Sequence, residues 1–515
     1  MIEENVYESE PNVSDYTQDN NGYVASLLDI YIASDKTPLL QNTQSNMAEK
    51  TGISQETLVS QAGQTIKAKR LPQYIASLAA TLGAVAAGMT LGWTSPAGTN
   101  GVNLAATYGF PITSEEFSWI GAFTPLGAAV VCIPIGILSD IIGRRISMLI
   151  LTVPFTIGWL CIIFANSVTM FYVGRFITGL SGGAFCVTAP MYTAEIAESA
   201  IRGSVGSYFQ LLLSVGILLA YLLGTCVDMF YLSIISATVP LIFCVIFFFM
   251  PETPTFYLMK ENEDAARASY IRLRGNQYNV EPELTVQKEA LEESRRNKVS
   301  FLTALKSKAC IKAIIISYGL MLFQQLSGVN AIIFYVGSIF SSAGGSLKPD
   351  VASIIVGAMQ VGAVFISTLI VDRLGRRLLL SVSIVAMFLC TLILGIYFYL
   401  TTVTDTSNIG WLPLLSVCVF IILFSLGFGP LPWMMIGELF APEIKGIAGS
   451  SACLLNWLMA FIVTKIYSNL NNALQSYGTF WLFSLICGIG IAFVLLLVPE
   501  TKGKTLEQIQ RELNT

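Results

Sequence analysis

Three charged motifs occur in the first half of this chain and recur, in the same order, in the second half. The first is a Gly-Arg-Arg turn, at residues 143–145 and again at 375–377. The second is a Glu followed seven positions later by a cation, and the third is a Pro-Glu-Thr run, at 251–253 and 499–501. The offsets between the copies are 232, 243 and 248 residues, so the chain is a duplication with small insertions. Parallel halves with a site between them are typical of transporters.

Long apolar stretches recur along most of the chain. The sequence is 54% hydrophobic and only 12% charged, too little charge to cover a globular surface. Twelve stretches are long enough to cross a bilayer. We predict an all-α membrane protein with twelve transmembrane helices in two pseudo-symmetric six-helix bundles. The spans are expected near residues 74–97, 117–139, 146–166, 168–191, 204–226, 229–250, 311–340, 351–371, 378–401, 411–437, 446–467 and 478–498.

The segments outside the membrane complete the predicted organisation. It comprises a disordered acidic tail (1–66), a first bundle (67–250), a linker with short helices (251–310), a second bundle (311–498) and a C-terminal tail (499–515). Mixed charges predict linker helices at 263–274 and 287–298. A capping pattern after Thr505 predicts a last helix with Leu506, Ile509 and Leu513 on one face.

Cations gather on one side of the predicted membrane. They precede the first span, follow the second and eighth spans, and number ten between residues 260 and 308. The opposite loops hold almost none, Lys348 being the clear exception. The positive-inside rule therefore places both termini and the central loop in the cytosol, and no cleavable signal peptide is visible.

Several kinds of chemistry are excluded by missing residue types. The chain has no histidine, so it has no Ser-His or Cys-His nucleophile and no histidine metal ligand. Its ten cysteines form no C-x-x-C pair and are expected to pack as small hydrophobes. No nucleotide-binding Gly-rich loop is present. We expect no enzymatic activity, cofactor, metal or nucleic-acid partner.

The repeated charges can be read as a gate on the cytosolic side. Gly136 is expected to let two helices approach closely, and ion pairs between the halves would hold this side shut. The alternative is that a positive-inside turn needs Gly and Arg anyway. The residues assigned to this gate are Asp140, Arg144, Arg145, Glu195, Arg202, Asp372, Arg373, Arg376, Arg377, Glu438 and Lys445. Arg175, deep in the fourth span, requires a partner that the sequence does not name.

Polar side chains inside the spans indicate the cargo. Amides both donate and accept hydrogen bonds, as vicinal hydroxyls require, and an indole can stack on the apolar face of a sugar. The alternative for each amide is a hydrogen bond between helices. The candidate substrate-binding residues are Gln210, Gln324, Gln325, Asn330, Gln360, Trp433 and Asn456. Gln324 and Asn330 can share a site only if their helix breaks, and Ser327-Gly328 supplies a break.

These motifs together resemble the sugar porter family of the major facilitator superfamily over roughly residues 70–510. The resemblance rests on QQLSGVN at 324–330, GPLPW at 429–433, the paired turns, PETP at 251–254 and PETKG at 499–503. GMTLGWTSP at 88–96 resembles arthropod facilitated trehalose transporters and class III glucose transporters. The resemblance implies alternating access around a sugar held by the seven residues above, and extracellular gate aromatics at Phe334 and Tyr335. Gln360 stands where several glucose transporters have Asn, so glucose selectivity does not transfer.

The leading functional hypothesis is a facilitative uniporter for trehalose or a hexose. The alternatives are a proton-coupled sugar symporter and a sugar-sensing receptor on a transporter scaffold. Symporters of this family carry an Asp in span one, where this chain has Thr90. A receptor would need a folded signalling domain, for which the acidic tail is too poor in apolar residues.

A short motif in the N-terminal tail bears on location. Asp35 stands four positions before Leu39-Leu40, the form of a dileucine signal that a sorting adaptor reads. The expected location is the plasma membrane, with cycling to endosomal or lysosomal membranes if the signal is used. If the match is fortuitous, steady residence at the plasma membrane is the better interpretation.

Overall fold

The computed structural model describes residues 68–296, 307–344, 348–371, 374–440, 442–504 and 506–514. Within these ranges the chain is helical and has no strand. This is the expected solution for a chain this apolar, because a bilayer offers no water to the backbone and a helix satisfies its own N–H and C=O groups. The predicted all-α fold class is confirmed.

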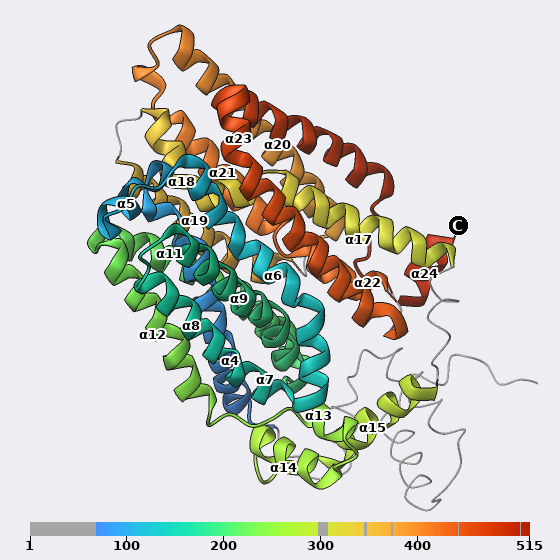
Figure 1. Cartoon of the computed structure of the whole chain (residues 1–515). Coiled ribbons are helices and arrows are strands. Elements are labelled where there is room, and N and C mark those ends of the chain that lie inside the picture. Colours follow the sequence, from blue (N-terminus) through green and yellow to red (C-terminus); the bar gives the residue numbers. More distant parts are fainter. Residues whose placement is uncertain are drawn as a thin grey trace, which may run out of the picture. The chain divides into compact units, whose positions relative to one another are not determined.

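The membrane-spanning helices follow the predicted order (Figure 1). In the first half they are α4 (Leu71–Gly92), α6 (Ser114–Ile142), α7 (Arg144–Ile150) with α8 (Thr152–Ile163), α9 (Val168–Ile196), α10 (Ser199–Gly206) with α11 (Tyr208–Cys226), and α12 (Met229–Phe247). In the second half they are α17 (Lys308–Leu326) with α18 (Val329–Ala343), α19 (Pro349–Ile370), α20 (Arg376–Val403), α21 (Leu412–Leu426) with α22 (Leu431–Leu439), and α23 (Pro442–Leu497).

The last of these helices contains two spans. The described residues hold eleven apolar helical segments long enough to cross a membrane, and the longest, Gly446–Leu497, has 52 residues. A bilayer core needs only about 20 helical residues. Gln475 has a non-helical backbone (φ 57°, ψ 173°) within this segment and divides it in two. The described chain therefore crosses the membrane twelve times, as predicted.

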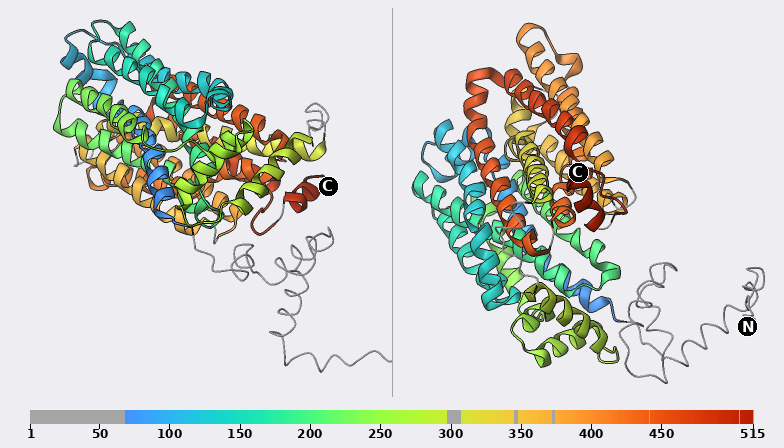
Figure 2. Two further views of the ribbon diagram at one scale, coloured as in Figure 1. Left: turned by 90° about the horizontal axis from the view of Figure 1, so that it is seen from below. Right: turned by 90° about the vertical axis from the view of Figure 1, so that its right-hand side faces the viewer.

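The two ends of the bundle differ in what they carry. One end, the linker end, carries α13 (Pro254–Met259), α14 (Glu263–Arg274), α15 (Glu281–Arg296) and α24 (Leu506–Asn514). The other, the loop end, carries η2 (Ser95–Ala97), η3 (Thr99–Gly101), α5 (Val102–Tyr108), η4 (Ser407–Ile409) and the turn at Gln475. Figure 2 gives two further views of the same helices.

The short helices attach to different halves. Arg274 of α14 donates to the carbonyl oxygen of Ile196 (2.7 Å), and its own carbonyl accepts from the N–H of Lys69 (2.8 Å), so the linker helices are held by the first half. α24 packs on α17 and α22 of the second half and buries Ile509 and Leu513. α14 has the predicted bounds. α15 begins six residues before the predicted 287, and residues 297 and 298 lie outside the described ranges.

Small residues let α6 and α9 pack closely. A Cβ at Gly127 would lie 2.1 Å from the carbonyl oxygen of Phe176, and one at Gly179 would lie 2.1 Å from that of Thr124. Such backbone contact is how helices associate in lipid. Gly136 does not take part, because nothing lies within 4 Å of the position its Cβ would occupy. The prediction of a close approach at Gly136 was wrong for this conformation.

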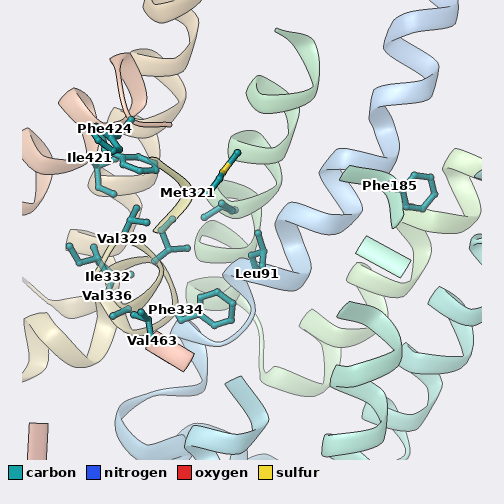
Figure 3. Packing of buried hydrophobic residues seen from close by; sticks show 14 of the residues in the cluster. Leu91, Phe185, Met321, Val329, Ile332, Phe334, Val336, Ile421, Phe424 and Val463 are labelled. Atoms are coloured by element: carbon teal, nitrogen blue, oxygen red, sulfur yellow. The ribbon is translucent and has the colours of Figure 1, made fainter. Parts of the chain in front are cut away.

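The buried apolar core continues from one half into the other. One cluster includes Leu91 of α4, Met321 of α17 and Phe334 of α18, which are labelled in Figure 3, and α18 contacts α4 directly. Val329, Ile332 and Val336 of α18 extend the same cluster. The segment after the break in the seventh span thus lies at the contact between the halves.

Candidate functional site

A continuous chain of hydrogen-bonded amides runs through the second half. Asn330 Nδ2 donates to Gln325 Oε1 (2.6 Å), and Gln325 Nε2 donates to Asn456 Oδ1 (3.0 Å). Asn456 Nδ2 in turn donates to Gln324 Oε1 (2.6 Å). Four of the seven predicted substrate-binding residues are therefore brought together, although their contacts are with one another.

The break in the seventh span makes this arrangement feasible. α17 ends at Leu326, and Gly328 has φ +88°, a conformation that glycine adopts without steric cost. A Cβ there would also lie 2.6 Å from the ring of Phe483. The predicted break is confirmed, and it lets Asn330, at the start of α18, reach the amide of Gln325.

A second helix break supplies backbone carbonyl oxygens that accept hydrogen bonds from Gln324 and that were not predicted from the sequence. Gln324 Nε2 donates to the carbonyl oxygens of Phe428 (2.6 Å) and Gly429 (3.0 Å), which lie between α21 and α22. These carbonyls are free because the run from Gly427 to Pro430 interrupts the helix. The Gly/Pro run was visible in the sequence, but which side chain would reach its carbonyls was not.

The other three predicted substrate residues stand apart from the chain of amides. Gln360 of α19 is 3% exposed and Gln210 of α11 is half-buried. Trp433 of α22 is 37% exposed, so its indole is open to the surroundings of this conformation. Among the described residues, no hydrogen bond joins any of these three side chains to the four amides.

The predicted gate aromatics are buried at the loop end. The ring of Tyr335 stacks on Tyr467 (centroids 5.1 Å apart, 19° between planes) and meets Phe117 of the first half edge-on at 6.1 Å. Its hydroxyl donates to the carbonyl oxygen of Thr464 (3.3 Å). Phe334 is buried in the shared core beside it. At this level the two halves are in contact.

At the linker end of the first half, the three charged motifs meet in one cluster. Glu252 accepts from the backbone N–H groups of Arg144 (3.1 Å) and Arg145 (3.0 Å), and so caps the N-terminus of α7. The side chain of Arg144 reaches Glu195 (Nε to Oε1, 3.0 Å). Thr253 Oγ1 donates to the other oxygen of Glu195 (2.5 Å).

The second half repeats this cluster atom by atom. Glu500 accepts from the N–H groups of Arg376 (2.8 Å) and Arg377 (3.1 Å) at the start of α20. Arg376 Nη2 lies 3.1 Å from Glu438 Oε1, and Thr501 Oγ1 donates to Glu438 Oε2 (2.5 Å). The three motifs therefore recur in order because each half forms the same hydrogen-bonded cluster, to which every motif contributes one group.

The pKa values of the two capping carboxylates are shifted in opposite directions. Burial raises the pKa of Glu252, although hydrogen bonds from the N–H groups of Thr253, Arg145 and Arg144 act to lower it. Burial also acts to raise the pKa of Glu500, but there the hydrogen bonds from backbone N–H groups prevail and the pKa is lowered. The cause of the difference is that Glu252 is the more deeply buried of the two.

The described ion pairs of these clusters lie within one half each. The cytosolic gate predicted from the sequence required ion pairs between the two halves. Asp140 pairs with Arg144 (2.9 Å) one turn away. Arg202 does not reach Glu195 and donates to the carbonyl oxygen of Ala197 (3.5 Å). Asp372, Arg373 and the side chain of Lys445 lie outside the described part of the chain.

The structure names the partners of Arg175. Its guanidinium donates to the carbonyl oxygens of Thr90 (2.7 Å) and Ile120 (3.2 Å) and to Thr94 Oγ1 (2.9 Å). It also lies 5.1 Å from the ring centroid of Trp93. All of these partners are uncharged, and they replace the water that a buried cation has lost.

The fold resembles that of solved major facilitator transporters. The structure of the proton:xylose symporter XylE bound to 6-bromo-6-deoxy-D-glucose matches with a TM-score of 0.71 at 24% identity, covering 86% of this chain and 99% of that one. An identity this low supports a statement about the fold alone. The family described as sugar (and other) transporters matches residues 22–513, and the chain belongs to that family.

Two relatives give the family resemblance more detail. The facilitated trehalose transporter Tret1 of Bombyx mori is 41% identical over 444 residues, which are 86% of this chain and 87% of that protein. The protein of the same name from Drosophila mojavensis is 40% identical over 443 residues. The match covers 86% of this chain but only 51% of the Drosophila protein, so the chain spans about half the length of that relative.

Proposed function

We propose that this protein is a facilitative transporter of trehalose or a hexose that works by alternating access. The observation that carries the proposal is the chain of four amides that runs from Asn330 through Gln325 and Asn456 to Gln324. It lies at the helix break between α17 and α18 and bonds to the break between α21 and α22. Amides can give up the hydrogen bonds between them and form hydrogen bonds with sugar hydroxyls instead, at little net cost in free energy. The names of the relatives, facilitated trehalose transporters, support the same substrate class.

Uniport is favoured over proton symport by the surroundings of Arg175. Its guanidinium bonds to Thr90 and Thr94, and the contacts found among the described residues include no carboxylate. A proton-coupled carrier needs a titratable group close to its site. Sugar uptake into proteoliposomes should therefore stop at equal concentrations inside and outside. Accumulation that is driven by a proton gradient and abolished by an uncoupler would instead support the symporter.

The charge distribution supports a cytosolic linker end. Arg144, Arg145, Arg376 and Arg377 all stand at this end, as do the Lys and Arg residues of the linker helices, and both termini would then be cytosolic. With this orientation the described conformation is closed at the outer end, where Tyr335 contacts Phe117 across the halves. Protease or tag accessibility in intact and permeabilised cells tests the orientation directly.

We place the protein in the plasma membrane, with cycling to an internal store through Asp35 and Leu39-Leu40. This motif lies outside the described residues, and the proposal rests on the sequence alone. A Leu39→Ala, Leu40→Ala double variant should show more protein at the cell surface than the parent does. An unchanged distribution would leave steady plasma-membrane residence and remove the proposed sorting adaptor.

The substrate is best identified by an uptake panel. Purified protein in vesicles is offered radiolabelled trehalose, glucose and fructose, and each uptake is competed with the unlabelled sugars. Saturable uptake of at least one of them is expected. If none enters while the inserted protein remains folded, the proposed substrate class is wrong.

A further inference from the structure

Lys465 is a cation inside an apolar helix that the sequence reading did not single out. It belongs to α23, and its side chain is only 13% exposed. A lysine within a membrane span is costly unless it is paired, so its partners are informative. Lys465 Nζ lies 2.6 Å from Glu115 Oε1 and 3.0 Å from Ser118 Oγ. It also lies 4.7 Å from the ring centroid of Trp119.

All three partners of Lys465 lie on α6, in the other half of the molecule. The ion pair between Lys465 and Glu115 therefore joins the two halves. Two further contacts accompany it on the same pair of helices. Ser114 and Ser468 hydroxyls lie 3.1 Å apart, and the rings of Trp119 and Phe461 lie 6.2 Å apart.

The contacts between α6 and α23 run from the loop end toward the interior of the bundle. Ser114 stands at the start of α6, and the deepest polar contact is between Cys132 Sγ and Cys453 Sγ (3.1 Å). Beyond it, Gly136 has open space where a Cβ would be. The two helices therefore meet at the loop end and diverge at the linker end, and Lys465 lies in the part that is closed.

Opening the loop end would have to pull α6 and α23 apart at this point. Lys465 would then lose a carboxylate, a hydroxyl and an indole face at once. Glu115 is 58% exposed, so water screens the pair and keeps its strength modest. A modest interaction suits a contact that must form and break in every cycle.

We propose that Lys465 and the first turn of α6 form a latch that stabilises the conformation closed at the loop end. Lys465 and Glu115 would be positioning residues, which set the balance between the two conformations without touching the sugar. The proposal rests on the alternating access proposed above. It predicts that removing either charge raises the fraction of molecules that are open at the loop end.

The test reads that fraction directly, with no sugar present. Ser95 is buried at the loop end, where its hydroxyl accepts from the N–H of Gly337 across the halves (3.2 Å). A Ser95→Cys reporter, in a Cys226→Ser background, is labelled on intact cells with a membrane-impermeant maleimide. Lys465→Met and Glu115→Gln should each speed labelling by about three- to tenfold. The Cys226→Ser protein without the reporter sets the background.

The controls separate a latch from general damage. Lys465→Arg keeps the charge and should label within about twofold of the parent, and the double variant Glu115→Lys with Lys465→Glu should restore slow labelling. The Lys465→Met, Glu115→Gln pair should label no faster than Lys465→Met alone, because that variant already removes the contact with Glu115. Unchanged labelling in folded, surface-expressed Lys465→Met overturns the latch. That result would leave sugar transport untouched, whereas failure of the uptake panel would leave the labelling result standing.

Discussion

Replacing Gln325 by Leu tests the chain of amides most directly, because Gln325 occupies its middle. Its carbonyl oxygen accepts from Asn330 and its amide nitrogen donates to Asn456. Leucine is apolar and close in size, so it fills the space and provides neither bond. One donor and one acceptor are orphaned in a buried place, and a sugar bound there also loses the amide that would have met its hydroxyls.

The expected loss of sugar affinity follows from these counts. An unmet buried hydrogen-bonding group costs roughly 1–3 kcal/mol, and about 1.4 kcal/mol is a factor of ten in affinity. Gln325→Leu should therefore weaken binding about ten- to a hundredfold. Asn330→Ala orphans only the oxygen of Gln325, and Asn330 is half-buried, so water can replace it. We expect its effect to be about half as large in free energy.

The assay is equilibrium binding of radiolabelled sugar to purified protein, with thermal unfolding measured in parallel to show that each variant is folded. Trp433→Ala is the third variant, since its indole is exposed and outside the chain of amides, and it should weaken binding without lowering the unfolding temperature. Parental affinity in all three variants would place the site elsewhere. A larger loss in Asn330→Ala than in Gln325→Leu would refute the argument from counted partners.

Three other perturbations give distinct outcomes. Thr90→Asp adds a carboxylate to the residue whose backbone carbonyl binds Arg175, so uptake should become pH-dependent, measured with a pH dye inside vesicles. Uptake that stays independent of pH would show that this carboxylate is not coupled to transport. Gly143→Ala should lower the unfolding temperature more than Gly375→Ala does. Both new Cβ atoms would lie 2.4 Å from a glutamate oxygen, but only Gly143 has a positive φ (+101°), which adds backbone strain of about 1–3 kcal/mol. Equal shifts in the two variants would show that backbone strain at residue 143 contributes little. Oxidation by O₂ with a copper catalyst should form a disulfide between Cys132 and Cys453, which joins the halves covalently. The joined halves are detected on a non-reducing gel after cleavage at a protease site inserted within 297–306. Cys453→Ser should abolish this cross-linked product.

The elements that the sequence predicted well are those set by local chemistry. Apolar length fixed the number of spans, since a bilayer permits few alternatives for such a segment. Mixed charge placed α14 correctly, and Gly328 marked the break in the seventh span because few other residues adopt its backbone conformation. The duplicated motifs indicated two equivalent halves before any contact was known.

The contacts that the sequence did not predict depend on which helices become neighbours. Arg144 and Glu195 were expected to reach across the halves, yet Glu252, 108 residues after Arg144, completes their cluster within one half. Arg175 donates to backbone carbonyl oxygens, which every residue has. A pattern of residue types therefore could not show which residues would be its partners. Lys465 was detectable as a charge in an apolar span, but its partner Glu115 is 350 residues away.

The four linked amides all belong to the second half of the chain, and this has a kinetic consequence. If the sugar binds to these amides, it remains bound to the second half while the first half moves relative to it. Most of its binding free energy is then the same whichever side of the membrane is open. The dissociation constants measured from the two sides should then be nearly equal, apart from what Gln210 and the rest of the first half contribute. A carrier built in this way runs equally well in both directions, and the sugar concentrations alone decide whether a cell takes sugar up or releases it.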